Sequence, residues 1–467
     1  MSFLIVLAAL CFLMWIAYRG HSVILFAPVA ALGAVLLTDP ALVAPMFTGL
    51  FMDKMVGFLK LYFPVFVLGA IFGKLIELSG FSKAIVAATI RLFGADRAML
   101  SIVAVCALLT YGGVSLFVVV FAVYPFAAEL FRQSNIPKRL IPGTIALGAF
   151  TFTMDALPGT PQIQNIIPST FFGTNSWAAP VLGCAGAVFI LIVGLVYLDW
   201  RRRAAAAAGE GYGDAASLLN EPAPFAGSTL ANPLVALLPL VLVGVSNKLF
   251  TALIPGFYGA KHEFVPAAMG TAAPVVQEVS KVAAIWAVEG ALLVGIACVL
   301  LTAWKPVMAS FAEGSKSAIG GALLASMNTA SEYGFGAVIA ALPGFVVVAQ
   351  ALAAIPNPLV NEAVTITALA GITGSASGGM SIALAAMAET FVANAQAAGI
   401  SMEVLHRVAA MASGGMDTLP HNGAVITLLA VTGLSHRQAY KDIFAITLIK
   451  TAAVFVVIGV FYVSGWV

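Results

Sequence analysis

The sequence predicts an all-α polytopic membrane protein. The chain has 467 residues, of which 61% are hydrophobic and only 9% are charged, and its mean hydropathy is +1.04. A soluble domain carries about 25% charged residues, so this composition cannot cover a surface that faces water. The apolar runs are unbroken and helix-length, for example residues 181–198 and 444–463. A membrane β-barrel would instead show alternating segments of about ten residues.

The first half of the chain alternates apolar runs with short polar or Gly/Pro-containing stretches. Its first run, MSFLIVLAALCFLMWIAY, lacks the basic flank of a signal peptide and is interpreted as a membrane helix. The candidate spans of this half lie at residues 3–18, 22–37, 59–78, 100–123, 140–152 and 180–200.

A long polar stretch, RRRAAAAAGEGYGDAASLLNEPAPFAGST, follows at residues 201–229. Its Gly- and Ala-rich composition predicts a soluble linker. Three arginines directly after an apolar run place this linker in the cytoplasm. Beyond it, the candidate spans lie at residues 230–250, 289–302, 320–353, 364–388, 404–431 and 443–463.

The two halves share a pentapeptide, MDALP at residues 154–158 and MDTLP at residues 416–420. Two glycine-containing stretches recur in the same order, LGAIF as FGAVI and YGGVSL as SGGMSI. Three collinear matches with nearly constant spacing indicate an internal duplication. The offsets are 267, 266 and 262 residues when Gly69 is set on Gly336, Gly112 on Gly378, and Asp155 on Asp417.

The positively charged loops of the two repeats do not correspond: where one repeat carries Lys and Arg in a loop, the matching loop of the other lacks them. Between the Gly-Gly and MDxLP motifs, the first half carries FRQSNIPKR, whereas the matching link of the second half, TFVANAQAAGISME, has no Lys or Arg. After the motif the pattern reverses, because residues 156–198 are uncharged and the second half carries HRQAYK. The positive-inside rule then gives the repeats inverted topology, as in many secondary transporters. We expect an N-terminal membrane repeat with leading helices (1–200), a cytoplasmic linker (201–231) and a C-terminal inverted membrane repeat (232–467).

Four polar stretches interrupt these apolar segments: TYGGVS, TFTMDALPGTPQ, GITGSASGGMS and GGMDTLPHNG. Broken helices are tolerated in a membrane only where they are buried in protein or line a cavity. Their glycines allow close backbone approach, and the N-termini of half-helices attract anions such as a carboxylate. The residues expected to bind such a substrate are Gly112, Gly113, Ser115, Thr153, Gly159, Thr160, Ser375, Ser377, Gly378, Gly379, Ser381 and Asn422.

Four titratable residues are candidates for proton coupling: Asp155, Asp417, His421 and Glu332. Simple N-capping also accounts for Asp155 and Asp417, because an Asp before a Pro-containing first turn is an ordinary helix start. A charge at membrane depth costs about 2.5–3.5 kcal/mol, however, and Ser or Asn would cap without that cost. Glu332 lies in the polar cluster SMNTASEYGFG, where interhelical packing is an equal alternative.

Enzymatic and ATP-driven functions find no support in the sequence. It has no Walker loop, no GxSxG elbow and no HExxH helix, and its four cysteines form no CxxC pair. We expect no cofactor and no metal site. The net charge of +2 carries no indication of nucleic-acid binding.

Over nearly its whole length the chain resembles the gluconate permease (GntP) family of the Ion Transporter superfamily. TYGGVSLFVVVFAVYPFAAELF is similar to the first re-entrant region of that family. TFTMDALPGTPQ is similar to a family stretch with Thr, Pro and Pro at the positions of Thr153, Pro158 and Pro161. TGSASGGMSIAL resembles the Gly-Ser-Ala-Thr re-entrant motif, and TGLSHRQAYKD resembles the loop that follows it.

The chain has Met154 and Thr160 at two positions where the sugar-acid permeases carry histidines, and it departs from them there. TMDALPGTPQIQN is similar to a branch of short hydroxy-acid permeases of the 3-hydroxybutyrate type. The resemblance implies re-entrant hairpins, proton symport, a bacterial inner (plasma) membrane, a homodimer and an elevator-type motion of a transport domain.

We therefore expect a proton-coupled symporter of a small organic (hydroxy)monocarboxylate such as gluconate or 3-hydroxybutyrate. Sodium coupling is the alternative, and it would use carbonyls, hydroxyls and Asn422 around the same breaks. A passive anion channel is the third possibility, and two inverted broken-helix sites argue against it. The expected partners are the organic anion, protons or Na⁺, the lipid bilayer and a second copy of the chain.

Overall fold

The structure is a computed structural model. It describes residues 2–19, 21–93, 97–213, 218–222, 230–264, 274–347, 355–420 and 422–467. His421, one of the four residues expected to couple protons, lies outside these described residues.

In the first half of the chain, the elements of the described residues are all helices. Its elements are α1 (Ser2–Tyr18), α2 (Val23–Thr38), η1 (Pro40–Leu42), α3 (Val43–Pro45), the π-helical η2 (Met46–Phe51), α4 (Met52–Leu78), α5 (Phe81–Phe93), α6 (Ala98–Tyr111), α7 (Leu116–Gln133), η4 (Lys138–Leu140), α8 (Ile141–Ala149), α9 (Phe152–Asp155), α10 (Ile163–Phe172) and α11 (Pro180–Ala207).

The second half is also helical, and this confirms the all-α class. The sequence did not predict the short antiparallel ribbon of β1 and β2, which pairs Lys261 with Glu278. The elements are α12 (Pro233–Tyr258), β1 (Lys261–Phe264), β2 (Val275–Glu278), α13 (Val279–Met308), α14 (Phe311–Ala341), α16 (Pro358–Thr373), α17 (Ala376–Ala397), α18 (Met402–Ser413), η6 (Met416–Thr418), α19 (Gly423–Thr432) and α20 (His436–Ser464).

Within the described residues, six helices are long and apolar enough to cross a membrane. At about 1.5 Å per residue, even the shortest of them, the 22-residue α17, exceeds the ~30 Å hydrocarbon core of a bilayer. The six are the continuous helix Pro40–Leu78 together with α11, α12, α13, α17 and α20. Outward-facing side chains on them, such as Val196 and Leu301, are apolar and exposed, which suits contact with lipid.

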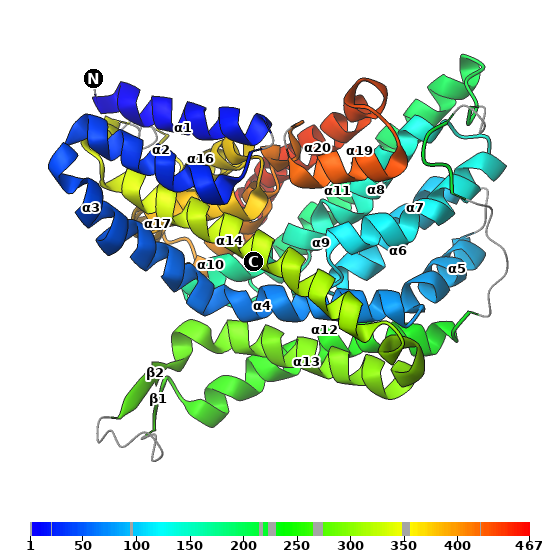
Figure 1. Cartoon of the computed structure of the whole chain (residues 1–467), viewed down its shortest axis with the longest axis horizontal. Helices are drawn as coiled ribbons and strands as arrows, with labels where there is room; N and C mark the ends of the chain where they lie inside the picture. The colour runs from blue at the N-terminus through cyan, green and yellow to red at the C-terminus, as the bar shows by residue number, and fades with distance from the viewer. Residues whose placement is uncertain are drawn as a thin grey trace.

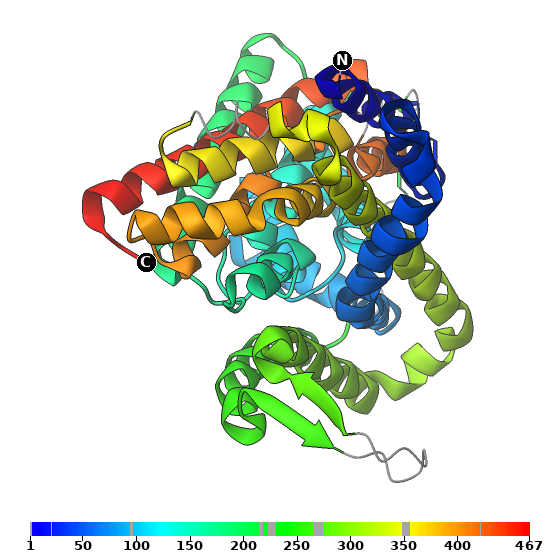
Figure 2. The same cartoon turned by 90° about the vertical axis from the view of Figure 1, so that its left-hand side faces the viewer.

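The helices gather into two groups. One group forms a frame in which α12 packs along α13, α4 packs along both α13 and α14, and α1 and α2 lie on the α14 side. Figure 1 shows α12 and α13 along one edge of the molecule, with α8, α11, α19 and α20 towards the opposite edge. In Figure 2 the ribbon β1–β2 projects from the α12–α13 side. The second group contains the four interrupted stretches.

This second group consists of two series of elements in the same order. The series α6–α11 and α16–α20 each contain a helix pair joined by a tight turn, then a short helix, a broken stretch, another short helix and a long helix. The turns are Gly112–Ser115 in the first series and Gly374–Ser375 in the second.

Three candidate spans are each divided at the polar stretches that the sequence predicted to interrupt them. Residues 100–123 divide into α6 and α7, residues 364–388 into α16 and α17, and residues 404–431 into α18, η6 and α19. The Gly-Gly alignment of the two halves is wrong. Gly112 and Gly374 cap the equivalent helices α6 and α16, whereas Gly378 lies inside α17. Gly374 follows Gly112 by 262 positions, the same offset that relates Asp155 to Asp417.

The predicted linker begins too early. α11 continues through RRRAAAA to Ala207, because Ala and Arg are strong helix formers and Asp199 pairs with Arg202 and Arg203 one turn on. Arg201 faces inwards from this extension and contacts Asp442 of α20 at 2.6 Å. The basic cluster therefore belongs to a helix end that is packed against the second half.

Candidate functional site

The turn between α6 and α7 packs against the first broken stretch. Gly113 has φ +95°, a conformation that favours glycine, and a Cβ there would press on Pro161. Gly112 sits against Leu240 of α12 with no room for a side chain. Ser115 is the N-cap of α7, and its hydroxyl makes no capping bond. Glycine thus lets this turn approach both the frame and the break.

The first break, between α8 and α10, is held by its own hydroxyls. Thr153 Oγ1 donates to the carbonyl of Gly148 at 2.9 Å, and Thr160 Oγ1 donates to the carbonyl of Thr153 at 2.8 Å. Gly159, with φ +79°, lies against the ring of Trp177. Both predicted hydroxyls therefore shape the loop, and their protons already have acceptors.

The turn between α16 and α17 is capped by Ser375, whose Oγ accepts from the Gly378 N–H at 3.1 Å. Ser377 Oγ lies 3.2 Å from Thr329 Oγ1 of α14. Gly379 packs directly on the backbone of α16 at Ala370. Ser381 Oγ is buried and has no hydrogen-bond partner among the described residues.

Glu332 of α14 lies at the start of α17. Its side chain is 3% exposed, and its Oε2 has no hydrogen-bond partner among the described residues. A Cβ at Gly378 would collide with that oxygen, so the glycine makes space for the carboxyl beside the first turn of α17. The positive end of a helix dipole stabilises an acidic group in this position.

The second break, between α18 and α19, contacts the second turn. Asn422 is the N-cap of α19, where its Oδ1 accepts from the Val425 N–H at 2.9 Å. Its Nδ2 donates to the carbonyl of Gly374 at 2.7 Å. In the first series, Gln162 Nε2 donates to the Thr110 carbonyl at 2.7 Å. Each break is therefore tied by an amide to the turn of its own series.

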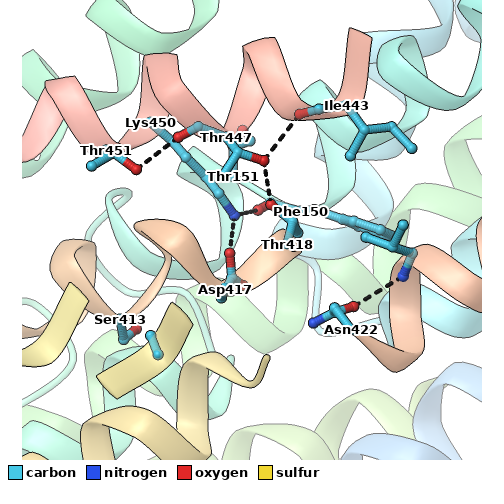
Figure 3. Close-up of polar contacts among 12 residues, drawn as sticks. Phe150, Thr151, Ser413, Asp417, Thr418, Asn422, Ile443, Thr447, Lys450 and Thr451 are labelled. Atoms are coloured by element: carbon cyan, nitrogen blue, oxygen red, sulfur yellow. Dashed lines mark hydrogen bonds and ion pairs between the residues drawn. The ribbon is translucent and has the colours of Figure 1, made fainter. Parts of the chain in front are cut away.

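The two breaks meet at one junction, and Lys450 of α20 joins them (Figure 3). Its Nζ lies 2.5 Å from Asp417 Oδ1 and donates to the Phe150 carbonyl, at the end of α8, at 3.0 Å. Asp155 is 2% exposed and packs on Gly414, where a Cβ would collide with its Oδ2. The two MDxLP acids thus lie at one place but differ, because only Asp417 has a cationic partner at contact distance.

The Oδ1 atom of Asp155 has no hydrogen-bond partner among the described residues. The carboxyl is nevertheless close enough to Lys450, Asp417 and Arg407 to interact with them electrostatically. Burying an ionised carboxylate with an unpartnered oxygen is costly.

Arg407 is fully buried in α18 and ties that helix to the loops around the first break. Its guanidinium donates to the carbonyls of Ala178 and Asp155, each at 2.8 Å, and to Asn165 Oδ1 at 3.0 Å. Its neighbour His406 is also fully buried and lies 2.6 Å from Thr174 Oγ1 through Nδ1. Arg407 is therefore a positive charge that is fixed beside Asp155.

A cavity of about 320 Å³ reaches this network from the α12–α13 side. Thr174, the partner of His406, is part of its wall. A larger cavity of about 500 Å³ lies between α5 and the start of α12, away from the breaks. We give more weight to the smaller cavity, because its wall contacts the buried polar network. It is lined by Gly173, Thr174, Asn175, Thr251, Pro255, Gly259, Ala260, Val279, Ser280, Ala283 and Ala284.

Sequence reasoning missed Lys450, Arg407 and Glu362. Lys450 did carry a signal, since it is the single charge in ITLIKTAAVFVV and intramembrane charges mark function. Arg407 carried none, because MEVLHRVAAMAS reads as an ordinary amphipathic helix. Glu362 of α16 is fully buried, and neither of its carboxyl oxygens has a hydrogen-bond partner among the described residues.

Comparisons with known proteins identify the class. No family model matches the chain. It is 59% identical over 475 residues to the uncharacterized transporter YxjC of Bacillus subtilis (strain 168), and the match covers 100% of each chain. Its fold resembles the crystal structure of the Alcanivorax borkumensis YdaH transporter, with a TM-score of 0.52, 15% sequence identity, and coverage of 92% of this chain and 90% of that one.

Together with the spans and the broken helices, these matches define a multi-pass membrane transporter and not an enzyme. At this identity over its full length, the chain belongs to the family of the Bacillus subtilis transporter YxjC.

Proposed function

We propose that the chain is a secondary active transporter that moves a small organic (hydroxy)monocarboxylate together with a proton across a bacterial inner membrane. Gluconate and 3-hydroxybutyrate exemplify the substrate class, as the resemblance to the gluconate permease family suggests. The observation that carries the proposal is Asp155, a buried carboxyl at the junction of two broken helices, one oxygen of which has no hydrogen-bond partner among the described residues.

Helix directions support an inverted-topology repeat. The start of α11 meets the end of α20, where the Val181 N–H donates to the carbonyl of Val467 at 3.3 Å. At the opposite end, Arg201 near the end of α11 contacts Asp442 near the start of α20. α11 and α20 occupy equivalent places in the two series, yet they run antiparallel, as an inverted repeat requires.

The short helices of the breaks support the same arrangement. Arg139, just before α8, contacts Asp442 at 3.4 Å, on the linker side of the molecule. Glu403, at the start of α18, accepts from the Ala179 N–H at 3.4 Å, at the other end of α11. α8 and α18 therefore approach the junction from opposite sides. The turns α6–α7 and α16–α17 would then be re-entrant tips.

Charge balance gives the junction a coupling mechanism. With Asp155 ionised, the two acids Asp155 and Asp417 balance the cations Lys450 and Arg407. Protonation of Asp155 leaves one net positive charge in a site of low dielectric constant, and that charge attracts a carboxylate. A substrate anion and a proton thus favour each other's binding. We propose that the substrate is held by the N-termini of α7 and α17 and by two hydroxyls. These are Ser115, which makes no capping bond, and Ser381, which has no hydrogen-bond partner among the described residues.

We expect Asp155→Asn to abolish uptake that is driven by a pH gradient and to preserve substrate exchange across the membrane. The amide is nearly isosteric with the protonated carboxyl, so the binding form persists and only proton release is lost. Reconstituted vesicles with a labelled carboxylate give both measurements: net uptake with the interior alkaline, and counterflow at equal pH.

The matched control is Asp199→Asn, because Asp199 lies in the last third of α11 and, within the described residues, pairs with the neighbouring Arg202 and Arg203. It should behave like the wild-type protein in both assays. If Asp155→Asn keeps full pH-driven uptake, Asp155 does not carry the coupling proton. If a sodium gradient alone drives uptake by the wild-type protein, the sodium-coupled alternative replaces this proposal. A channel would show no counterflow.

A further inference from the structure

We propose that Lys450 acts as a built-in cation that fills the position a coupling sodium ion would occupy between the two breaks. The inference deepens the proposed function and rests on it, because it concerns which ion can drive transport. Lys450 is 2% exposed, and its ammonium reaches the junction from α20.

The ligands of the ammonium are those of a sodium site in a broken-helix transporter. One is the carboxylate of Asp417, at 2.5 Å, and the other is the Phe150 carbonyl, at 3.0 Å, where α8 ends. Carboxylates and unwound backbone carbonyls are the groups that hold Na⁺ at such helix ends. An ammonium carries the same single charge and donates up to three hydrogen bonds to the same oxygens.

No second monovalent cation fits beside Lys450, because two like charges at contact distance repel each other strongly at low dielectric constant. The other cation near the junction, Arg407, already donates to the carbonyls of Ala178 and Asp155 and to Asn165. Asp417 therefore keeps a partner that is covalently attached to the chain and cannot dissociate. The positive charge that exchanges during transport is therefore a proton, and Asp155 binds it.

Removal of the ammonium turns the position into an empty cation site. In Lys450→Ala, the Asp417 carboxylate and the Phe150 carbonyl face a space that suits Na⁺ or a small alkylammonium ion. In Lys450→Met, an uncharged chain of similar length fills that space. The first variant should regain its cation from solution, and the second should not.

The test is thermal unfolding of the purified detergent-solubilised protein, without substrate or gradient, in titrations of NaCl, methylammonium chloride and choline chloride. We expect Lys450→Ala to have a lowered Tm that NaCl or methylammonium raises in a saturable way, with choline inactive. The Tm of the wild-type protein and of Lys450→Met should respond equally to all three salts. Adding Asp417→Asn to Lys450→Ala should remove the specific response, because the carboxylate ligand is lost.

A merely structural ion pair gives a different result: Lys450→Ala is destabilised, and no cation restores it specifically. That outcome overturns the inference, and so does a sodium-specific rise in the Tm of the wild-type protein. If Lys450→Ala fails to fold, we test instead the double variant Lys450→Met and Asp417→Asn, in which both side chains are uncharged. It must fold without responding specifically to sodium, and a specific response in this double variant also refutes the inference. Because no transport is measured, failure here is distinct from failure of proton coupling in the vesicle assays.

Discussion

At the scale of single residues, the two acids of the repeated pentapeptide are not equivalent. The sequence presents Asp155 and Asp417 in nearly identical contexts, so it offers no basis for giving them different roles. The structure separates them through Lys450, which lies 33 positions beyond Asp417 and contacts only one of the pair. Such a partner comes from tertiary packing, and a motif cannot reveal it.

Several predicted substrate ligands turn out to be occupied by structural bonds. Thr153 and Thr160 donate to carbonyls within their own loop, and Asn422 caps α19 while it bonds to Gly374. Hydroxyl and amide side chains at a helix break form hydrogen bonds with the backbone groups that the break leaves free. The sequence alone does not tell which of these side chains do so and which bind a ligand.

The tight contact between Gly414 and Asp155 gives a residue-scale prediction. In Gly414→Ala, the new Cβ would overlap Asp155 Oδ2, so the carboxyl must move from the junction. We expect a stability loss of about 1–3 kcal/mol, as for other overpacked sites, together with a changed pH profile of uptake. Thermal unfolding and vesicle uptake between pH 5.5 and 8 measure both effects.

The control for that variant is Gly459→Ala in α20, because no atom lies within 4 Å of the Cβ it would add. This change should leave the pH profile unaltered and raise stability by up to about 1 kcal/mol, since Ala is the better helix former. Equal pH profiles for both variants would contradict the placement of Asp155 against Gly414.

At the scale of elements, composition indicated where helices break but not how the broken ends pair. Glycine and proline clusters located the α6–α7 and α16–α17 turns and both breaks. The register of the repeat was wrong by four positions at the second turn, because SGGMSI lies inside α17 and only resembles YGGVSL in letters. Gly374, with φ +64°, performs the turn instead.

The described part of the linker is packed against the helices and held there by hydrogen bonds and ion pairs. Glu221 accepts from Tyr212 at 2.9 Å and contacts Lys138 at 2.8 Å and Arg132 at 2.7 Å. The preceding Asn220 donates through Nδ2 to the carbonyl of Ala430, near the end of α19. This segment, residues 218–222, therefore bridges the first and second series on the side of the basic loops.

The charge of Glu221 holds that bridge. Burial acts to raise the pKa of Glu221, but hydrogen bonds from Lys138, Arg132 and Tyr212 outweigh it and set the pKa below its ordinary value. Because the folded pKa is depressed, the stabilisation is fully present above the unfolded pKa of about 4.3 and is lost as pH falls through the folded value. Between pH 5.5 and 8 the bridge should not respond to pH.

We expect Glu221→Gln to undock the segment, because it leaves the buried Lys138 without its counter-charge. Limited proteolysis within residues 208–222 should become several-fold faster, and thermal stability should fall by about 1–3 kcal/mol. Glu313→Gln is the control, since the Glu313–Lys316 pair is exposed and contributes little. Equal cleavage rates in both variants would show that Glu221 does not anchor the segment.

At the scale of the whole molecule, a frame and a pair of opposed series account for the architecture. The frame of α4, α12, α13 and α14 holds long helices, of which α13 is kinked at Ala303, whereas the turns and the two breaks lie in the second group. The elevator-type motion of a transport domain and the homodimer stay predictions from the family resemblance. Apolar composition sufficed to predict the membrane class, but the grouping depends on which helices pack together, which no local pattern encodes.

The orientation of the molecule gives the last prediction. α12 separates the linker side from the ribbon β1–β2 by a single span, so Arg203 and Glu263 should lie on opposite sides of the membrane. We expect Arg203 on the cytoplasmic side, because arginines after a membrane span favour that side. In a background without native cysteines, we expect Glu263→Cys to react with a membrane-impermeant maleimide in intact cells, and Arg203→Cys to react only after permeabilisation. Both positions are exposed, so access is limited by the membrane and not by packing. Labelling of both from the same side would mean that α12 does not cross, and would contradict the predicted orientation.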